Sequence, residues 1–379
     1  MAQKKLSYWK KRALKQEQAS QVRTDNIEQV ITNAYLKAQD YLTSQVKKIF
    51  NRVKNKNSFE TSEFKRILNE SVSPSSLVEL QTIAKKIVDP ELQQSAKRTL
   101  NALAAKGRIT RLDDLKGKMH ITVNRVANVQ LNKTTDFFIS EIHEAYNDTL
   151  AEEFVHELSN KGIIFEIWNK NRTYEFKELP IQKTRTILES RWLGSNYSER
   201  IWGDTEALAK RLEELFTVEA LSGMSEFEMA KAIAKEFDRS INVARRLIRT
   251  EANYMANQAK LKAWESRGVK HYKLVVVLDL RTSKICQKKS REDKVYKVSE
   301  AVVNGEKGNY PPFHPWCRTV VIAYHGERTT KGIRTANDPI SNETFTIKQS
   351  ATYDGWMNIL KKRYSQEEIE KQKKKLKAA

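Results

Sequence analysis

Apolar residues recur at helical spacing through most of the first 160 residues. Between Ile27 and Val53 they fall mostly three or four positions apart, and polar side chains fill the opposite face. This period predicts one long amphipathic helix that begins near Asp25. The same spacing predicts further helices over residues 58–72, 77–88, 90–105 and 138–158. Pro90 suits a first helical turn, whereas Gly107 and Gly117 interrupt the pattern between the last two helices.

The pattern changes after Gly162. Residues 163–168 and 174–179 are rich in β-branched and aromatic side chains and predict two paired strands. Helical spacing then returns over residues 205–221 and 225–237. Ser225 lies three residues before Glu228, which is the spacing of a helix-capping box, and Gly223 lies where the preceding helix should end.

The order of these elements predicts an α+β protein with a long N-terminal helical region and a small mixed module of helices and sheet. At 379 residues the chain is long enough for two or three substructures, each with a core. The expected divisions are a basic arm over 1–24, a helical region over 25–162, a mixed connecting region over 163–224, the module over 225–328 and a basic tail over 329–379.

Positive charge is concentrated at both ends of the chain. The net charge is +21, and residues 1–25 and 361–379 each carry +5. Basic ends release counterions when they meet phosphate, so we expect non-specific, salt-sensitive binding to DNA, with solubility as the alternative role. The candidate DNA-binding residues are Lys4, Lys5, Lys10, Lys11, Arg12, Lys371, Lys373, Lys374, Lys375 and Lys377.

Hydropathy favours a protein that acts in the cytoplasm and binds no membrane. Apolar residues make up 39% of the chain and charged residues 30%, which suits a folded, helix-rich protein. No apolar stretch approaches the roughly 20 residues that span a bilayer. The basic first residues lack the apolar core of a secretory signal.

The only two cysteines, Cys286 and Cys317, lie near His314 in sequence. Thiolate and imidazole are the ligands that zinc prefers, and His-x-x-Cys can present two of them on one turn. A fourth ligand would come from Asp279, His271 or water. A disulfide or a pair of packed, reduced thiols are the alternatives. The other histidines, His120, His143, His156 and His325, are expected to stand alone as surface or packing residues.

The segment Arg249-Thr250-Glu251 lies on a predicted helix whose apolar face holds Ile248, Ala252, Met255 and Ala259. Arg249 and Glu251 point apart on such a helix, so each should find a partner elsewhere. We expect Asp279 to pair with Arg249, and Arg281 or Arg318 to pair with Glu251. Buried ion pairs of this kind would fix the helix against a sheet.

Together these pieces resemble the phage minor head protein family, the Mu F-like head morphogenesis proteins of tailed phages. The resemblance covers about residues 225–325. It rests on the Arg-Thr-Glu helix, the strand-like residues 272–278 and the cysteine region. Its structural motif residues are Arg249, Thr250, Glu251, Arg281, Pro312 and Arg318.

The resemblance implies a non-enzymatic minor capsid protein that joins the portal vertex during procapsid assembly and is packaged in low copy number. It would lie in the virion, inside the capsid near the portal, after assembly in the host cytoplasm. Its partners would be the portal, the scaffold or major capsid protein, and DNA, and it could aid genome packaging or ejection.

Two enzyme classes compete with this interpretation: a metal-dependent nuclease that uses the Cys/His cluster, and an ADP-ribosyltransferase-type effector that uses Arg249 and Glu251. Residues 353–364 carry an apolar stripe that would dock either on a partner or on the chain's own module.

Overall fold

The computed structural model describes residues 2–56, 60–162, 178–329, 332–348 and 350–378. The side chains of residues 2–19, 21, 328, 377 and 378 are outside this description. The expected strand at 163–168 and residues 174–177 of the second expected strand lie outside the described residues, and residues 178–179 are not in a strand. The chain divides into two compact units, and α1, α5 and α10 supply residues to both.

Unit 2 comprises residues 24–137 and 196–248 and is helical. Its helices are α1 (Ala2–Lys54, from Thr24), α2 (Thr61–Leu68), α3 (Ser75–Ala84), α4 (Pro90–Ala104), α5 (Arg111–Asn160, to Phe137), α8 (Tyr197–Leu215), α9 (Val218–Gly223) and α10 (Glu226–Arg267, to Ile248).

The periodic apolar residues of α1 form the core of unit 2, as their spacing predicts. Leu42 and Val53 are fully buried. Tyr35 packs edge-on against Phe237 of α10, and its hydroxyl donates to Gln130 Oε1 at 2.8 Å. A buried hydroxyl with a partner avoids the cost of an unsatisfied polar group, so this pair fixes α1 against α5 without weakening the core.

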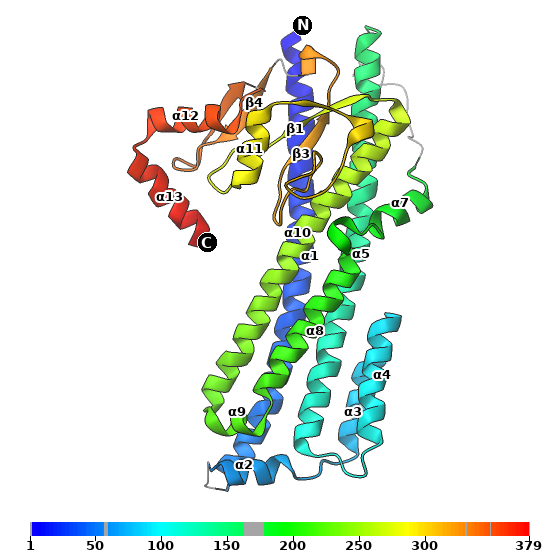
Figure 1. Cartoon of the computed structure of the whole chain (residues 1–379), viewed down its shortest axis with the longest axis vertical. Coiled ribbons are helices and arrows are strands. Elements are labelled where there is room, and N and C mark those ends of the chain that lie inside the picture. The colour runs from blue at the N-terminus through cyan, green and yellow to red at the C-terminus, as the bar shows by residue number, and fades with distance from the viewer. Residues whose placement is uncertain (1, 57–59, 163–177, 330–331, 349, 379) are drawn as a thin grey trace. The chain divides into compact units, whose positions relative to one another are not determined.

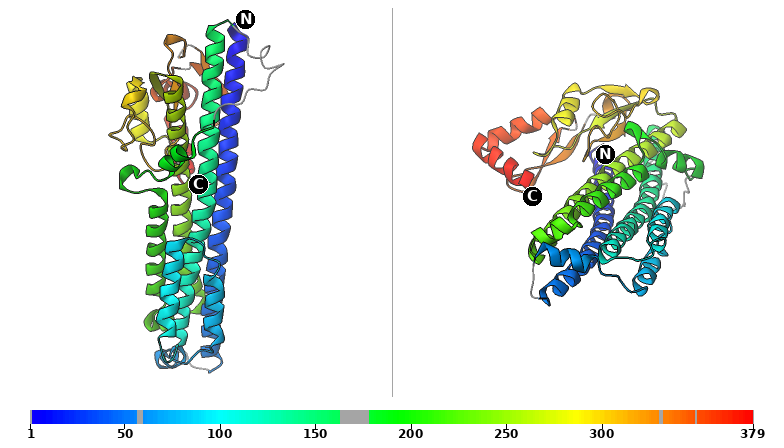
Figure 2. Two further views of the ribbon diagram at one scale, coloured as in Figure 1. Left: turned by 90° about the vertical axis from the view of Figure 1, so that its right-hand side faces the viewer. Right: turned by 60° about the horizontal axis from the view of Figure 1, so that its bottom comes forward.

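The sequence suggested that Gly117 interrupts the helical pattern, but this residue lies inside α5. A β-carbon at this position would come within 2.7 Å of Leu103 Cδ1. The glycine therefore allows α5 to approach α4 closely, and that packing offsets the poor helix propensity of glycine. Figure 2 shows α3 and α4 in cyan, side by side, as their contacts require.

The helix α1 begins at Ala2 and not near Asp25, so residues 2–24 of the expected basic arm are the first part of this helix. Lysine, arginine, glutamine and alanine dominate this stretch and favour helix even without an apolar stripe. Within unit 1, Ser20 and Arg23 at the end of this stretch both donate to Glu141 of α5, at 2.8 and 2.5 Å. Their contacts place this part of α1 beside α5.

Unit 1 comprises residues 1–23, 138–195 and 249–379 and holds the strands. Its other elements, shown in Figure 1, are α7 (Ile181–Leu188), η1 (Trp192–Gly194), β1 (His271–Val275), α11 (Lys284–Glu292), β2 (Val295–Lys297), η2 (Val298–Glu300), β3 (Val320–Ala323), η3 (Glu327–Thr329), β4 (Ile333–Asn337), β5 (Thr344–Lys348), α12 (Tyr353–Arg363) and α13 (Gln366–Ala378).

Two antiparallel sheets lie among the described residues of unit 1. The first has the order β2-β1-β3, with Tyr272 opposite Tyr296 and Ala323. The fully buried Tyr272 ring packs against Trp264 of α10 and against Tyr310, which fixes the helix on this sheet. The second sheet is the hairpin β4-β5. The α+β class expected from the sequence is therefore confirmed.

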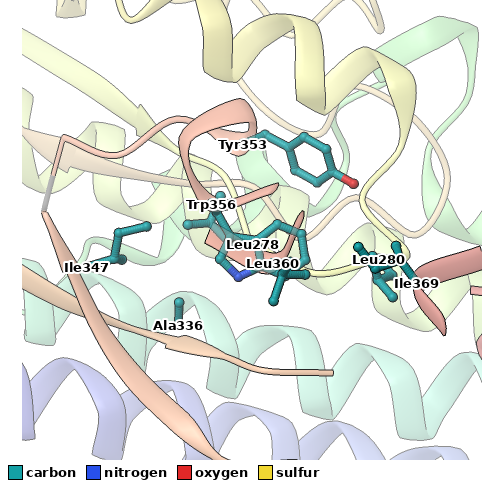
Figure 3. Close-up of a cluster of buried hydrophobic side chains, with 8 residues drawn as sticks. All are labelled: Leu278, Leu280, Ala336, Ile347, Tyr353, Trp356, Leu360 and Ile369. Atoms are coloured by element: carbon teal, nitrogen blue, oxygen red, sulfur yellow. The ribbon is translucent and has the colours of Figure 1, made fainter. Parts of the chain in front are cut away.

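Residues 329–379 are not a simple basic tail, because most of them fold. The hairpin and the two last helices enclose an apolar cluster in which Trp356 and Leu360 are fully buried (Figure 3). Leu278 and Leu280, which follow β1, complete that cluster. The apolar stripe of residues 353–364 therefore docks on the chain's own module, one of the two roles expected for it.

Candidate metal centre

The two cysteines and His314 meet at one point of unit 1. Cys286 Sγ lies 3.1 Å from His314 Nε2 and 3.9 Å from Cys317 Sγ. Both cysteines are buried and free. The sulfur separation is nearly twice a disulfide bond length of about 2.05 Å, so the expected alternative of a disulfide is not what the structure holds.

Local structure brings these three side chains together from two segments. Cys286 lies in the first turn of α11, where the Ser283 side chain caps the helix and accepts from the Cys286 backbone N–H at 3.1 Å. His314 and Cys317 lie on the turn before β3, joined by a hydrogen bond from the Cys317 N–H to the His314 carbonyl at 3.1 Å. The preceding Pro311–Pro312 bond is cis.

The environment separates the pKa values of the two thiols. The Cys286 thiol hydrogen-bonds the Cys317 sulfur, which lowers the pKa of Cys317 and raises that of Cys286. Burial by itself would lower the pKa of His314, but the Cys317 sulfur more than offsets it and the pKa is raised. Within this pair the thiolate form is therefore favoured at Cys317 over Cys286.

Asp279 does not belong to this cluster. It accepts two hydrogen bonds from the Arg318 guanidinium, one of them at 2.9 Å, and one from the Arg281 backbone N–H at 2.9 Å. These contacts lower the pKa of Asp279 against the opposing effect of burial. The expected pairing of Asp279 with Arg249 is therefore wrong, and Arg318 is not the partner of Glu251. His271 lies on β1, paired with Lys297, and is also outside the cluster.

The Arg-Thr-Glu segment of α10 holds the turn that carries the cluster. The Thr250 hydroxyl accepts from the Trp316 backbone N–H at 3.0 Å, and Asn253 Nδ2 donates to the Thr319 carbonyl at 3.1 Å. Trp316 has a left-handed backbone with φ of 63°, which is costly for a bulky residue. The Arg249 guanidinium lies 6.0 Å from the Trp316 ring centre. The helix thus supports a strained turn.

Glu251 is nearly inaccessible, at 1% exposure, and its carboxylate accepts from Trp192 Nε1 at 2.9 Å. The Trp192 ring stacks on Tyr254, one turn further along α10. Sequence reasoning missed Trp192 because it lies 59 residues from Glu251, in a segment without a helical or strand period. An indole near a buried carboxylate leaves no signal in spacing.

Residues 210–322 match the family model described as Phage Mu protein F like protein. We name residues 210–322 the Mu F-like domain after this similarity. The match links the chain to phage head morphogenesis, as the resemblance implied, and it spans α10, the first sheet and the whole Cys/His cluster. Searches of curated proteins and of solved structures found no match.

Several histidines expected to stand alone have partners. His120 Nε2 lies 2.9 Å from Glu213 Oε1. Next to the Mu F-like domain, in unit 1, His325 Nε2 lies 3.0 Å from Glu153 Oε2, and the His156 ring stacks on His325 at 3.8 Å. Glu153, His156 and His325 form a second group of candidate metal ligands among the described residues. The expectation that His120, His156 and His325 stand alone is therefore wrong.

The candidate DNA-binding residues fall into two sets. Lys4, Lys5, Lys10, Lys11 and Arg12 lie on α1, and Lys377 lies on α13, where side chains are outside the described part. Lys371, Lys374 and Lys375 are exposed on α13, and Lys373 is half-buried with its ammonium 3.5 Å from Glu370.

Over the described part of the chain, no helix has the length and apolar character needed to cross a membrane.

Proposed function

We propose that this protein is a minor capsid protein of a tailed phage that joins the portal vertex during procapsid assembly and is packaged in low copy number. The observation that carries the proposal is the Mu F-like domain at residues 210–322. The portal is the main partner, and the scaffold or major capsid protein is a further one. The protein is then found inside the virion, near the portal.

Contact with packaged DNA is the second part of the proposal. The net charge of +21 gives the protein a long-range attraction to phosphate. Exposed lysines on α13 offer part of that charge to a nucleic acid. Such binding is independent of sequence and weakens with salt, which suits a protein that helps a genome enter or leave a head without reading it.

The burial of Glu251 argues against an ADP-ribosyltransferase. A carboxylate that acts on a nicotinamide ribose must reach substrate, whereas Glu251 is 1% exposed and bonded to an indole. Its role is to join α10 to residues 190–194.

The metal-dependent nuclease also finds little support. The Cys/His cluster gives three ligand atoms, and Asp279, the carboxylate expected beside them, is paired with Arg318. A hydrolytic metal site would also need a base beside the metal.

Particle composition tests the proposal. A phage that encodes the protein with a C-terminal tag should yield purified heads that contain the tagged chain, with fewer copies than the major capsid protein by quantitative mass spectrometry. Cys286→Ser and His314→Ala should lower its incorporation without removing any turnover. A protein that stays in the lysate, absent from procapsids and virions, would contradict the proposal. Loss of a measurable nuclease or transferase activity in these variants at unchanged fold would favour an enzyme.

A further inference from the structure

We propose that Cys286, His314 and Cys317 bind a single zinc ion within the Mu F-like domain. In a tetrahedral site with Zn–S bonds of about 2.3 Å, two sulfurs lie roughly 3.8 Å apart. The two Sγ atoms are 3.9 Å apart. Cys286 Sγ and His314 Nε2 are 3.1 Å apart, a few tenths of an ångström below the separation of about 3.6 Å that zinc would impose. The ligand atoms are thus nearly in place.

The surroundings of His314 orient its Nε2 toward the Cys286 sulfur. The imidazole Nδ1 donates to the Pro315 carbonyl at 2.6 Å, which leaves Nε2 as the nitrogen with a lone pair. Histidines that bind zinc usually donate their other ring nitrogen to a carbonyl or carboxylate in this way. The Ser283 hydroxyl lies 2.7 Å from Nε2 and would turn away when a metal binds.

Two groups outside the cluster also favour a charged thiolate at Cys286. Cys286 is the third residue of α11, so the positive end of the helix faces its sulfur. The Thr319 hydroxyl donates to Cys286 Sγ at 3.2 Å. These groups form the outer hydrogen bonds that zinc ligands require, and they are placed by α11 and β3 independently of any ion.

The fourth position is filled by water in this proposal. Asp279 is held by Arg318, and the described cluster supplies three ligand atoms. A zinc ion with two thiolates, an imidazole and water joins the start of α11 to the turn before β3 and offsets the left-handed backbone of Trp316. In this proposal the ion holds these two segments together, whether or not the protein enters a phage head.

The second group, Glu153, His156 and His325, is a weaker zinc site. Its two rings are nearly parallel, at 15°, and 3.8 Å apart, so their lone pairs point along separate planes and do not converge. His325 Nε2 is also engaged by Glu153. This group provides a matched histidine control within the same unit.

Metal analysis of the full chain tests the proposal. Protein purified without chelator, then incubated with zinc and dialysed, should retain one zinc ion per chain. Cobalt in place of zinc should give the sulfur-to-cobalt charge-transfer band and the intense ligand-field bands of a tetrahedral thiolate site. Removal of zinc from the wild type with a chelator should lower the thermal unfolding midpoint, and zinc should restore it.

The variants assign the ion to one group. Cys317→Ser and His314→Gln should lose the zinc and the cobalt bands, and His325→Gln should keep both. Loss of zinc in His325→Gln with retention in His314→Gln would overturn the assignment. If the cysteine variants do not fold, measurements on the wild type still test the proposal. A wild-type protein that retains no zinc or gives no cobalt–sulfur band would contradict it. A Cys286–Cys317 disulfide that persists under reducing conditions would also contradict it.

Discussion

Trp192 donates its indole N–H to the buried carboxylate of Glu251 at 2.9 Å, which joins residues 190–194 to the Arg-Thr-Glu segment of α10. The same segment uses Thr250 to hold the backbone of Trp316, beside Cys317. One helical turn therefore supports both a distant tryptophan and the turn that carries the Cys/His cluster.

The Trp192→Phe variant tests the first of these contacts. Phenylalanine keeps a ring to stack on Tyr254 but cannot donate to Glu251, so the protein should lose about 2 kcal/mol of unfolding free energy. Urea unfolding followed by circular dichroism measures this loss. Trp316→Phe is the control because Trp316 is 42% exposed, and it should change stability far less. Equal effects of both variants would show that the indole–carboxylate bond contributes nothing specific.

The C-terminal cluster predicts a large effect at Trp356. The ring is fully buried against Leu278 and the hairpin β4-β5, so Trp356→Ala should cost about 3–5 kcal/mol. Limited proteolysis should then cut the segment after residue 329 faster than in the wild type. Ile333→Ala on β4 is the matched control, since Ile333 is 52% exposed. A Trp356→Ala protein with wild-type stability and protease resistance would mean that this segment is not docked.

Acid should weaken the same C-terminal segment through Asp338. Burial opposes ionisation there, but hydrogen bonds from two backbone N–H groups, Tyr364 and Arg363 hold the pKa of Asp338 below its ordinary value. A lowered pKa stabilises the fold above the unfolded value of about 4, and this contribution is lost as the pH falls through the folded value.

The unfolding midpoint should therefore fall between about pH 5 and about pH 2, with a smaller fall in Asp338→Asn. Glu343→Gln on the same hairpin removes an exposed carboxylate and should keep the wild-type pH profile. An Asp338→Asn protein whose midpoint follows the wild type throughout would rule out this linkage.

The lysines of α13 predict a change in the salt dependence of DNA binding. If Lys374 and Lys375 each neutralise a phosphate, Lys374→Gln/Lys375→Gln should reduce the slope of log affinity against log salt by about 2. The double variant Lys85→Gln/Lys86→Gln removes the same charge from an exposed part of unit 2 and should have less effect. Fluorescence anisotropy with a labelled duplex measures both. Identical slopes would place DNA contact elsewhere on the chain.

Sequence periodicity predicted the elements that bury one apolar face. The helix α4 begins at Pro90, as expected, and Ser225 and Glu228 cap each other at the start of α10, with hydrogen bonds of 2.8 and 3.2 Å. The start of α1 was missed because its first residues favour helix through composition and lack an apolar stripe. The hairpin β4-β5 was missed although Phe345 and Ile347 alternate with polar residues in β5, because β4 has only Ala336 on the matching face and both strands are five residues long.

The sequence predicted which residues form the candidate metal centre, but not which charged residues pair around it. Cysteine and histidine stand out chemically in any sequence, so Cys286, His314 and Cys317 could be grouped before the fold was known. Charged residues have many equivalent partners, and sequence could not distinguish Arg318 from Arg249 as the partner of Asp279. That choice depends on the turn geometry near Trp316.

Co-purification with the portal protein of the same phage tests whether this protein joins the portal vertex. The tagged full-length protein is mixed with portal at low and at high salt, with and without nuclease treatment. Portal binding should survive high salt and nuclease, while bound DNA should be lost at high salt. Absence of portal binding under every condition, with the protein folded by circular dichroism, would contradict the account.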